Sequence, residues 1–146
     1  MDAGTGTTAF NGKIGQLDGL GDAVGAALTL DSTGSTNFAD TVEANSGIVA
    51  AGPLTFAGDV TLDDGDTAST FSGRVTTGDN TISGFDGLNF DGGLSMTGNT
   101  VLVSNGADTS FGDTVDGAFE LDIDALAGAA GSATGLGQID SELTKL

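Results

Sequence analysis

Apolar and polar residues alternate along much of this chain with a period of two. Over residues 54–62 the sequence LTFAGDVTL places an apolar residue or Gly at every second position, with Thr, Ala and Asp between them. Residues 88–96, LNFDGGLSM, repeat this order. A period of two is typical of β strands with one buried and one wet face. The pattern predicts an all-β protein built from many short strands.

The alternating segments carry a repeat of the form Phe-x-[Gly/Asp]-x-[Val/Ile/Leu]. Its six copies begin at Phe10, Phe38, Phe56, Phe71, Phe90 and Phe111. Successive Phe residues lie 28, 18, 15, 19 and 21 positions apart. A repeat of about 20 residues is typical of a solenoid, in which each unit buries its apolar face against the next. Because the motif recurs in one phase, with a small Gly or Asp two residues after each Phe, we expect the six rings to form a structural stack, in which Gly leaves room for the ring inside a narrow coil.

These patterns predict a single-stranded parallel β-solenoid, a right-handed β-helix with about six or seven coils. Shorter apolar pieces, such as 28–30 and 101–103, supply the other sides of each coil, and Gly-Asp and Asn-Gly pairs supply the corners. We expect one domain over residues 1–146, with regular coils over about 5–124. Residues 125–146 form an irregular or capping segment, whose end, residues 138–146, fits a short amphipathic helix or an irregular last strand about equally well. An antiparallel β-sandwich alternates in the same way and is the alternative fold.

The composition narrows the chemistry open to the chain. It contains 26 Gly and no Cys or His, which excludes disulfides, Cys-ligated zinc and the usual general base at neutral pH. With 21 acidic residues against three basic ones the net charge is −18, so the cations that nucleic acids and anionic membranes require are missing. The N-terminal sequence MDAGTGTTAF lacks the features of a signal peptide, and no apolar run approaches the ~18 residues of a membrane span. We expect no nucleic-acid partner and no membrane insertion.

Clustered carboxylates are the strongest candidates for a site. The clusters are Asp63, Asp64 and Asp66; Asp113 and Asp116; and Asp122 and Asp124. Paired carboxylates can cleave glycosides, but acid–base work needs one carboxylate with a raised pKa in a cleft, whereas these lie at predicted corners and wet faces. The first cluster is also the candidate ligand set for calcium, although no stretch matches an EF-hand or the nonapeptide of calcium-binding β-rolls. We expect a protein that is not an enzyme and has no cofactor, with calcium as the one candidate metal.

Longer strings of the sequence resemble a known class of bacterial protein. GPLTFAGDVTLDDGDTASTFSGRV and ADTSFGDTVDGAFELDIDALAG are similar to the repeat region of filamentous-haemagglutinin-like large exoproteins and related β-helical surface adhesins. That region consists of T-x-F-x-G-x-V strands separated by corners rich in Gly, Thr, Asn and Asp. The resemblance implies a right-handed parallel β-helix, secretion or display on the bacterial cell surface, and a role as stalk or adhesive fibre. It carries over no catalytic residues.

We therefore expect a structural, non-catalytic segment of a secreted or cell-surface fibre or adhesin. One alternative is a self-assembling filament subunit, because the open ends of a solenoid expose unpaired strand edges. Another is a carbohydrate- or ligand-binding module on the solenoid flank, which would need a groove lined by clustered Asp. The expected partners are accordingly copies of the chain itself, or glycans on a host cell or surface.

Overall fold

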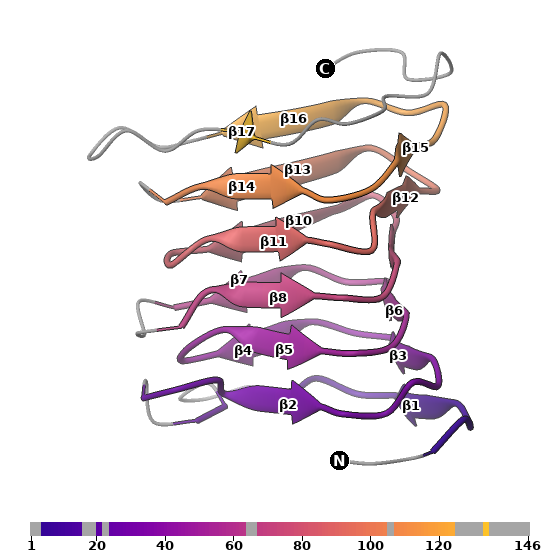
Figure 1. Cartoon of the computed structure of the whole chain (residues 1–146), viewed down its shortest axis with the longest axis vertical. Coiled ribbons are helices and arrows are strands. Elements are labelled where there is room, and N and C mark those ends of the chain that lie inside the picture. The colour runs from indigo at the N-terminus through magenta and orange to yellow at the C-terminus, as the bar shows by residue number, and fades with distance from the viewer. Residues whose placement is uncertain are drawn as a thin grey trace.

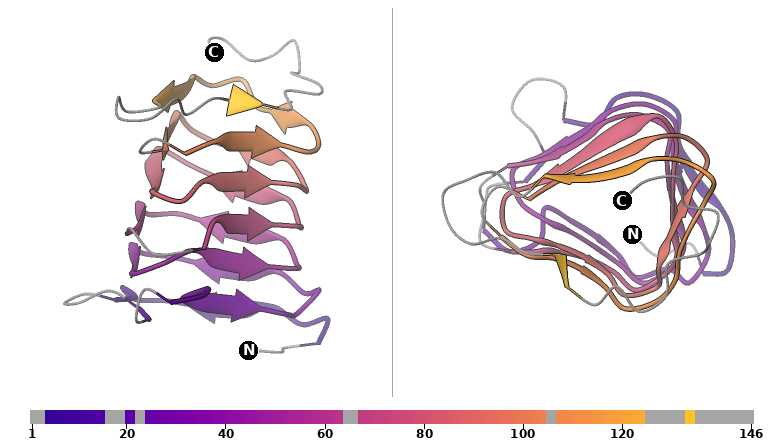
Figure 2. Two further views of the ribbon diagram at one scale, coloured as in Figure 1. Left: turned by 60° about the vertical axis from the view of Figure 1, so that its left-hand side comes forward. Right: turned by 90° about the horizontal axis from the view of Figure 1, so that it is seen from above.

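The computed structural model describes residues 4–15, 20–21, 24–63, 67–104 and 107–124, and the backbone of residues 133–134. The described secondary structure is β, in three parallel sheets that form the sides of a coil with a triangular cross-section (Figure 1, Figure 2). Sheet A contains β1 (Thr8–Phe10), β3 (Thr36–Phe38), β6 (Leu54–Phe56), β9 (Val75–Thr77), β12 (Leu94–Met96) and β15 (Val115–Asp116). Sheet B contains β4 (Val42–Ala44), β7 (Val60–Leu62), β10 (Asn80–Gly84), β13 (Thr100–Ser104) and β16 (Leu121–Asp124). Sheet C contains β2 (Leu28–Leu30), β5 (Ile48–Ala50), β8 (Ser69–Phe71), β11 (Leu88–Phe90), β14 (Thr109–Phe111) and β17 (Ala133–Thr134).

Each strand pairs in parallel with the strand that occupies the same side one coil later. Thr36 of β3 is aligned with Leu54 of β6, which is aligned with Val75 of β9. In Figure 1 the chain runs along sheet C in front, turns through sheet A and returns along sheet B behind while it rises, which makes the coil right-handed. The predicted parallel β-solenoid is confirmed. The sandwich alternative is wrong, because every strand pair in the described part of the chain is parallel.

Five coils in the described part of the chain carry a strand on all three sides: β3–β5, β6–β8, β9–β11, β12–β14 and β15–β17. Aligned positions on sheet A advance by 18, 21, 19 and 21 residues, from 36 to 54, 75, 94 and 115. In the first coil the isolated bridges Ile14↔Val42 and Leu20↔Ala44 replace a strand of sheet B, and the last coil ends in the two-residue β17. The regular stack is therefore shorter than the six or seven coils predicted. The end segment predicted over residues 125–146, apart from β17, lies outside the described residues.

The core consists of columns of inward-facing side chains, which run from coil to coil along the inner face of each sheet. In most three-residue strands the first and third side chains are buried and the middle one faces outward, so the period of two is confirmed. Leu54, Phe56, Val60 and Leu62 are each at most 2% exposed. The sequence places these four on one face of one strand, but the chain turns a corner at Gly58, so they line two different sheets.

Each of the six Phe rings contacts the next one along the sequence, but the rings lie in two columns, one on sheet A and one on sheet C. The rings of β1, β3 and β6 stack on sheet A with centroids 5.0 and 5.2 Å apart. On sheet C the rings of β8 and β11 are tilted by 38° with centroids 5.2 Å apart, and those of β11 and β14 stack at 5.4 Å. Phe56 and Phe71 lie in the same coil and meet edge to face at 6.0 Å. The prediction that the motif recurs in one phase is therefore wrong. The 15-residue spacing from Phe56 to Phe71 is the path from sheet A to sheet C within a single coil.

A column of glycines forms the corner between sheets C and A. Gly34, Gly52, Gly73 and Gly92 each stand two residues before a strand of sheet A. A Cβ on Gly52 would lie 2.3 Å from the carbonyl oxygen of Gly34, and a Cβ on Gly73 would lie 2.3 Å from the carbonyl carbon of Gly52. The spacing between coils, rather than an unusual φ, therefore requires glycine at this corner.

We expect Gly73→Ala to lower the free energy of unfolding by about 1–3 kcal/mol, because its Cβ overlaps the backbone of the coil below. Gly12→Ala is the matched control, because a Cβ at Gly12 has no atom within 4 Å. Urea unfolding of both variants followed by circular dichroism checks this. Equal stability of the two variants would contradict the steric origin of the glycine column.

Candidate functional site

The carboxylate clusters singled out in the sequence lie on the outside of the coil. Asp122 and Asp124 project outward from β16 and are exposed, and Asp63 is exposed at the end of β7. Asp64 and Asp66, the other candidate calcium ligands, lie outside the described residues. No group of three acidic side chains in the described ranges is arranged to hold a metal ion, and no pocket indents the surface there.

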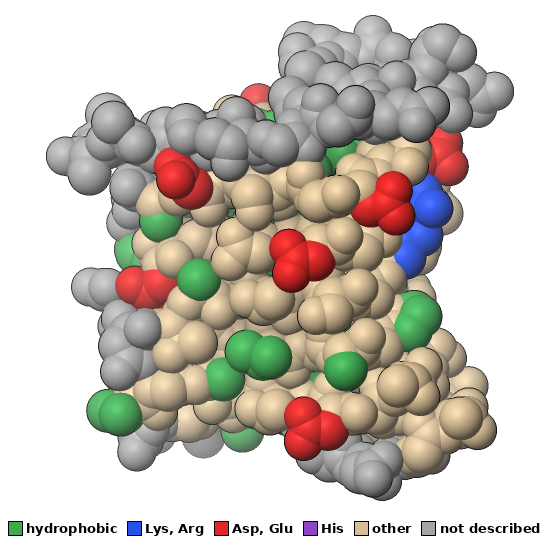
Figure 3. Space-filling model, viewed as in Figure 1, with side chains coloured by type: hydrophobic (Ala, Val, Ile, Leu, Met, Phe, Trp, Pro, Cys, Tyr) green, Lys and Arg blue, Asp and Glu red, His purple; other side chains and the backbone are tan. Residues whose placement is uncertain are grey.

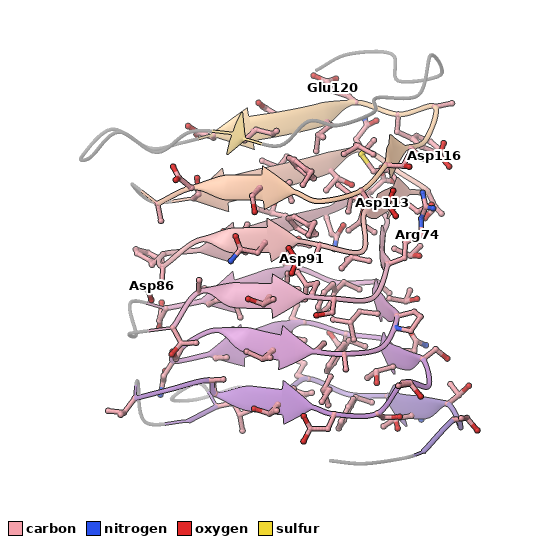
Figure 4. The ribbon with its side chains drawn as sticks, in the orientation of Figure 1. Arg74, Asp86, Asp91, Asp113, Asp116 and Glu120 are labelled. Atoms are coloured by element: carbon pink, nitrogen blue, oxygen red, sulfur yellow. The ribbon has the colours of Figure 1, made fainter. Side chains whose placement is uncertain are left out.

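Arg74, Asp113 and Asp116 lie near one another on the outside of the coil, where β9 and β15 of sheet A begin (Figure 4). Arg74 Nη2 lies 3.5 Å from Asp116 Oδ2, and both side chains are more than 40% exposed, so this ion pair contributes little to stability. Asp113 Oδ1 accepts hydrogen bonds from the backbone N–H of Thr114 at 2.8 Å and from its hydroxyl at 3.1 Å. These two bonds, with a smaller contribution from Arg74, lower the pKa of Asp113. A general acid needs the opposite shift, so the surroundings of Asp113 do not suit that role.

The corner between sheets A and B carries a ladder of Asp and Asn side chains. Asp79 Oδ1 accepts the backbone N–H of Asn99 at 2.8 Å, and Asn99 Oδ1 accepts the backbone N–H of Glu120 at 3.1 Å. One coil lower, Asp59 Oδ1 accepts the backbone N–H of Thr81 at 2.8 Å. Each side chain therefore satisfies a backbone donor of the coil above it, where the strand ladder has not yet begun. The sequence signal was present, since positions 59, 79 and 99 are 20 residues apart, but the Phe pattern obscured it.

A buried polar network occupies the inside of the same corner. Thr77 stands above Phe56 in register and its hydroxyl lies 2.7 Å from that of Thr100. Asn80 is 6% exposed and donates from Nδ2 to the carbonyl oxygen of Gly58 at 2.9 Å, while its Oδ1 accepts the N–H of Gly78 at 3.2 Å. The network begins where the Phe column leaves sheet A. Sequence reasoning missed it because these residues read as ordinary turn and strand residues.

The remaining buried hydroxyls offer no catalytic constellation. Ser46, Ser104 and Thr109 have hydroxyl oxygens without a hydrogen-bond partner in the described structure. A nucleophilic hydroxyl needs an adjacent base, and the sequence contains no His.

Comparison with known protein families, with curated proteins and with solved structures found no match for this chain. Among the described residues no helix is long and apolar enough to cross a membrane.

We expect Asp79→Ala to lower the free energy of unfolding by about 1 kcal/mol, because the N–H of Asn99 loses its acceptor. Asp79→Asn retains an oxygen in the same place, as Asn99 does one coil higher, and should be close to wild type in urea unfolding. Loss of protection of the Asn99 amide in the alanine variant alone would locate the effect. Identical behaviour of the two variants would contradict a role for the ladder oxygen.

Proposed function

We propose that the chain is a structural, non-catalytic β-helical segment of a secreted or cell-surface fibre. The observation that carries this proposal is the continuity of the interior along the coil axis. Each described coil contributes a slab of buried side chains, and the slabs stack in register through parallel strand pairs. Adding coils to such a stack lengthens a stiff rod without changing its width, which is the mechanical property that a stalk needs.

The distribution of charge supports an exposed, hydrated rod. In the register pairs of the sheets, each carboxylate stands over a neutral neighbour: Asp116 over Ser95, Asp122 over Val101, and Asp124 over Val103. Like charges directly opposite on neighbouring strands destabilise a sheet. This spacing keeps the described strand carboxylates apart on the outer faces of the sheets. The net charge of the whole chain, −18, favours solubility and opposes side-by-side association. Figure 3 shows acidic side chains scattered over one such flank among polar and small residues.

The resemblance to filamentous-haemagglutinin-like repeats adds the cellular setting to this proposal. The string TFAGDV corresponds to the end of β6, a corner at Gly58 and the start of β7, so the motif is the unit that turns the chain from one side to the next. We propose on that basis that the rod is bacterial and is displayed outside the cell, with surface glycans among its partners. A glycan-binding groove has less support, because the described Asp side chains lie on corners and outward faces.

We expect antibodies raised against the folded chain to label intact cells of the bacterium that produces it, because a stalk segment is exposed on the cell surface. Immunofluorescence before and after permeabilisation measures this, with a cytosolic protein as the control. Labelling that requires permeabilisation would overturn the proposed location. Binding of the purified chain to a glycan array would support the proposed glycan partners, and it would favour a ligand-binding module over a stalk without a binding face.

A filament subunit is the second candidate, and the first coil favours it. Phe10, Ile14 and Leu28 face the interior but are only partly buried, whereas their counterparts one coil higher are buried. Lys13 precedes Ile14, and Asp122 precedes Ile123, at aligned positions of the first and last coils. A second copy stacked in the same register would place Lys13 over Asp122, which is a favourable pair.

We expect end-to-end stacking, if it is the function, to appear as a concentration-dependent series of species in sedimentation velocity. Lys13→Glu should abolish the series, because it replaces an attraction to Asp122 by a repulsion, and Lys13→Arg should retain it. Monomers at every concentration and salt strength would exclude the filament and leave the stalk proposal standing.

A further inference from the structure

Asn11 and Gly12 occupy an open corner of the first coil. Both residues are exposed, and a Cβ built on Gly12 would meet no atom within 4 Å. They follow β1 and precede Ile14, whose N–H donates to the carbonyl oxygen of Thr41 at 3.1 Å. The N–H of Gly12 donates no hydrogen bond within the described part of the chain. Neither the side-chain amide of Asn11 nor the nitrogen that follows it is therefore held in place.

An Asn with a free, unhindered nitrogen after it is chemically unstable in water. The nitrogen attacks the side-chain carbonyl carbon, and a cyclic imide forms as the amide nitrogen leaves as ammonia. Water then opens the ring at one of its two carbonyl groups and gives Asp or isoaspartate. Glycine in the second position favours the attack because it has no Cβ to block it and adopts the required backbone conformations freely.

The other described asparagines do not meet these conditions. Asn37 and Asn89 are followed by a Phe whose nitrogen lies within a strand. Asn80 is buried and hydrogen-bonded through both side-chain atoms, and Asn45 donates from Nδ2 to the carbonyl oxygen of Gly21 at 2.9 Å. Asn99 is held in the ladder at the corner between sheets A and B, and the nitrogen after it donates to the carbonyl oxygen of Glu120 at 2.9 Å.

We propose that Asn11-Gly12 is a site of spontaneous deamidation and isoaspartate formation that loosens the first coil. The isoaspartate inserts one methylene group into the backbone between Phe10 and Ile14. The carbonyl oxygen of Phe10 accepts the N–H of Ala39 at 2.9 Å, and that of Ile14 accepts the N–H of Glu43 at 2.9 Å, so these two anchors are tied to the coil above. The longer link between them no longer matches the corner of the second coil.

Neighbouring amides of β4 give the modification a specific readout. The N–H of Glu43 donates to Ile14 in the first coil, whereas the N–H of Val42 donates to Asp59 in the third. Loosening of the first coil should therefore expose the amide of Glu43 to hydrogen exchange and leave that of Val42 protected.

The test is to incubate the full chain in mildly alkaline buffer and map its peptides by mass spectrometry. We expect Asp and isoaspartate to accumulate at position 11 faster than at any other described Asn, with Asn105 scored separately because its surroundings are not described. Gly12→Ala should slow the reaction by about tenfold, since its Cβ hinders the attack, and Asn11→Gln should suppress it. The aged wild-type chain should lose protection at Glu43 and keep it at Val42.

Two results would overturn the proposal. One is an Asn11 that reacts no faster than Asn37 or Asn89. The other is a chain that carries isoaspartate at position 11 but retains full protection of the Glu43 amide, which would mean that the first coil accommodates the longer backbone.

Discussion

The distance between coils governs the rest of this structure. Parallel strand pairing sets that distance at about 4.8 Å, and every interior and corner residue has to fit within it. The stacked Phe rings fit because their centroids can lie 5.0–5.4 Å apart in register. At the corner between sheets C and A the same distance leaves no space for a Cβ, so Gly34, Gly52 and Gly73 follow one another there. The stacked apolar side chains, the glycine column and the Asp/Asn ladder all fit the same distance between neighbouring coils.

The architecture could be predicted from the sequence because its signals are local and repeated. Period-two alternation and the Phe motif indicated parallel coils, and the structure contains them. The assignment of residues to sides could not be predicted in the same way. Phe56 and Phe71 carry the same motif, yet one lies on sheet A and the other on sheet C, because each position is defined by its neighbours in adjacent coils.

For the polar residues, too, the sequence predicted the residue types at the corners but not their hydrogen-bond partners. Asp and Gly at corners were expected from their turn preferences, but turn preferences say nothing about which backbone donor an Asp side chain will meet. The bond from Asn99 to Asp79 joins residues 20 positions apart and exists only once two coils are aligned. The network of Thr77, Asn80 and Thr100 was missed for a related reason, since buried polar side chains are recognised by their partners and not by their types.

The change of the Phe column from sheet A to sheet C also bears on how the chain finds its register. A solenoid of identical coils could shift by one whole coil and lose only the contacts at its ends. Here a shift by one coil would separate Thr77 from its position above the last ring of sheet A, and it would move Asn80 away from the carbonyl oxygen of Gly58. Misaligned pairings are therefore penalised by mismatched interiors. Because the repeat is irregular, the interior of each coil fits only its own neighbours, and this fixes the position of the coil along the rod.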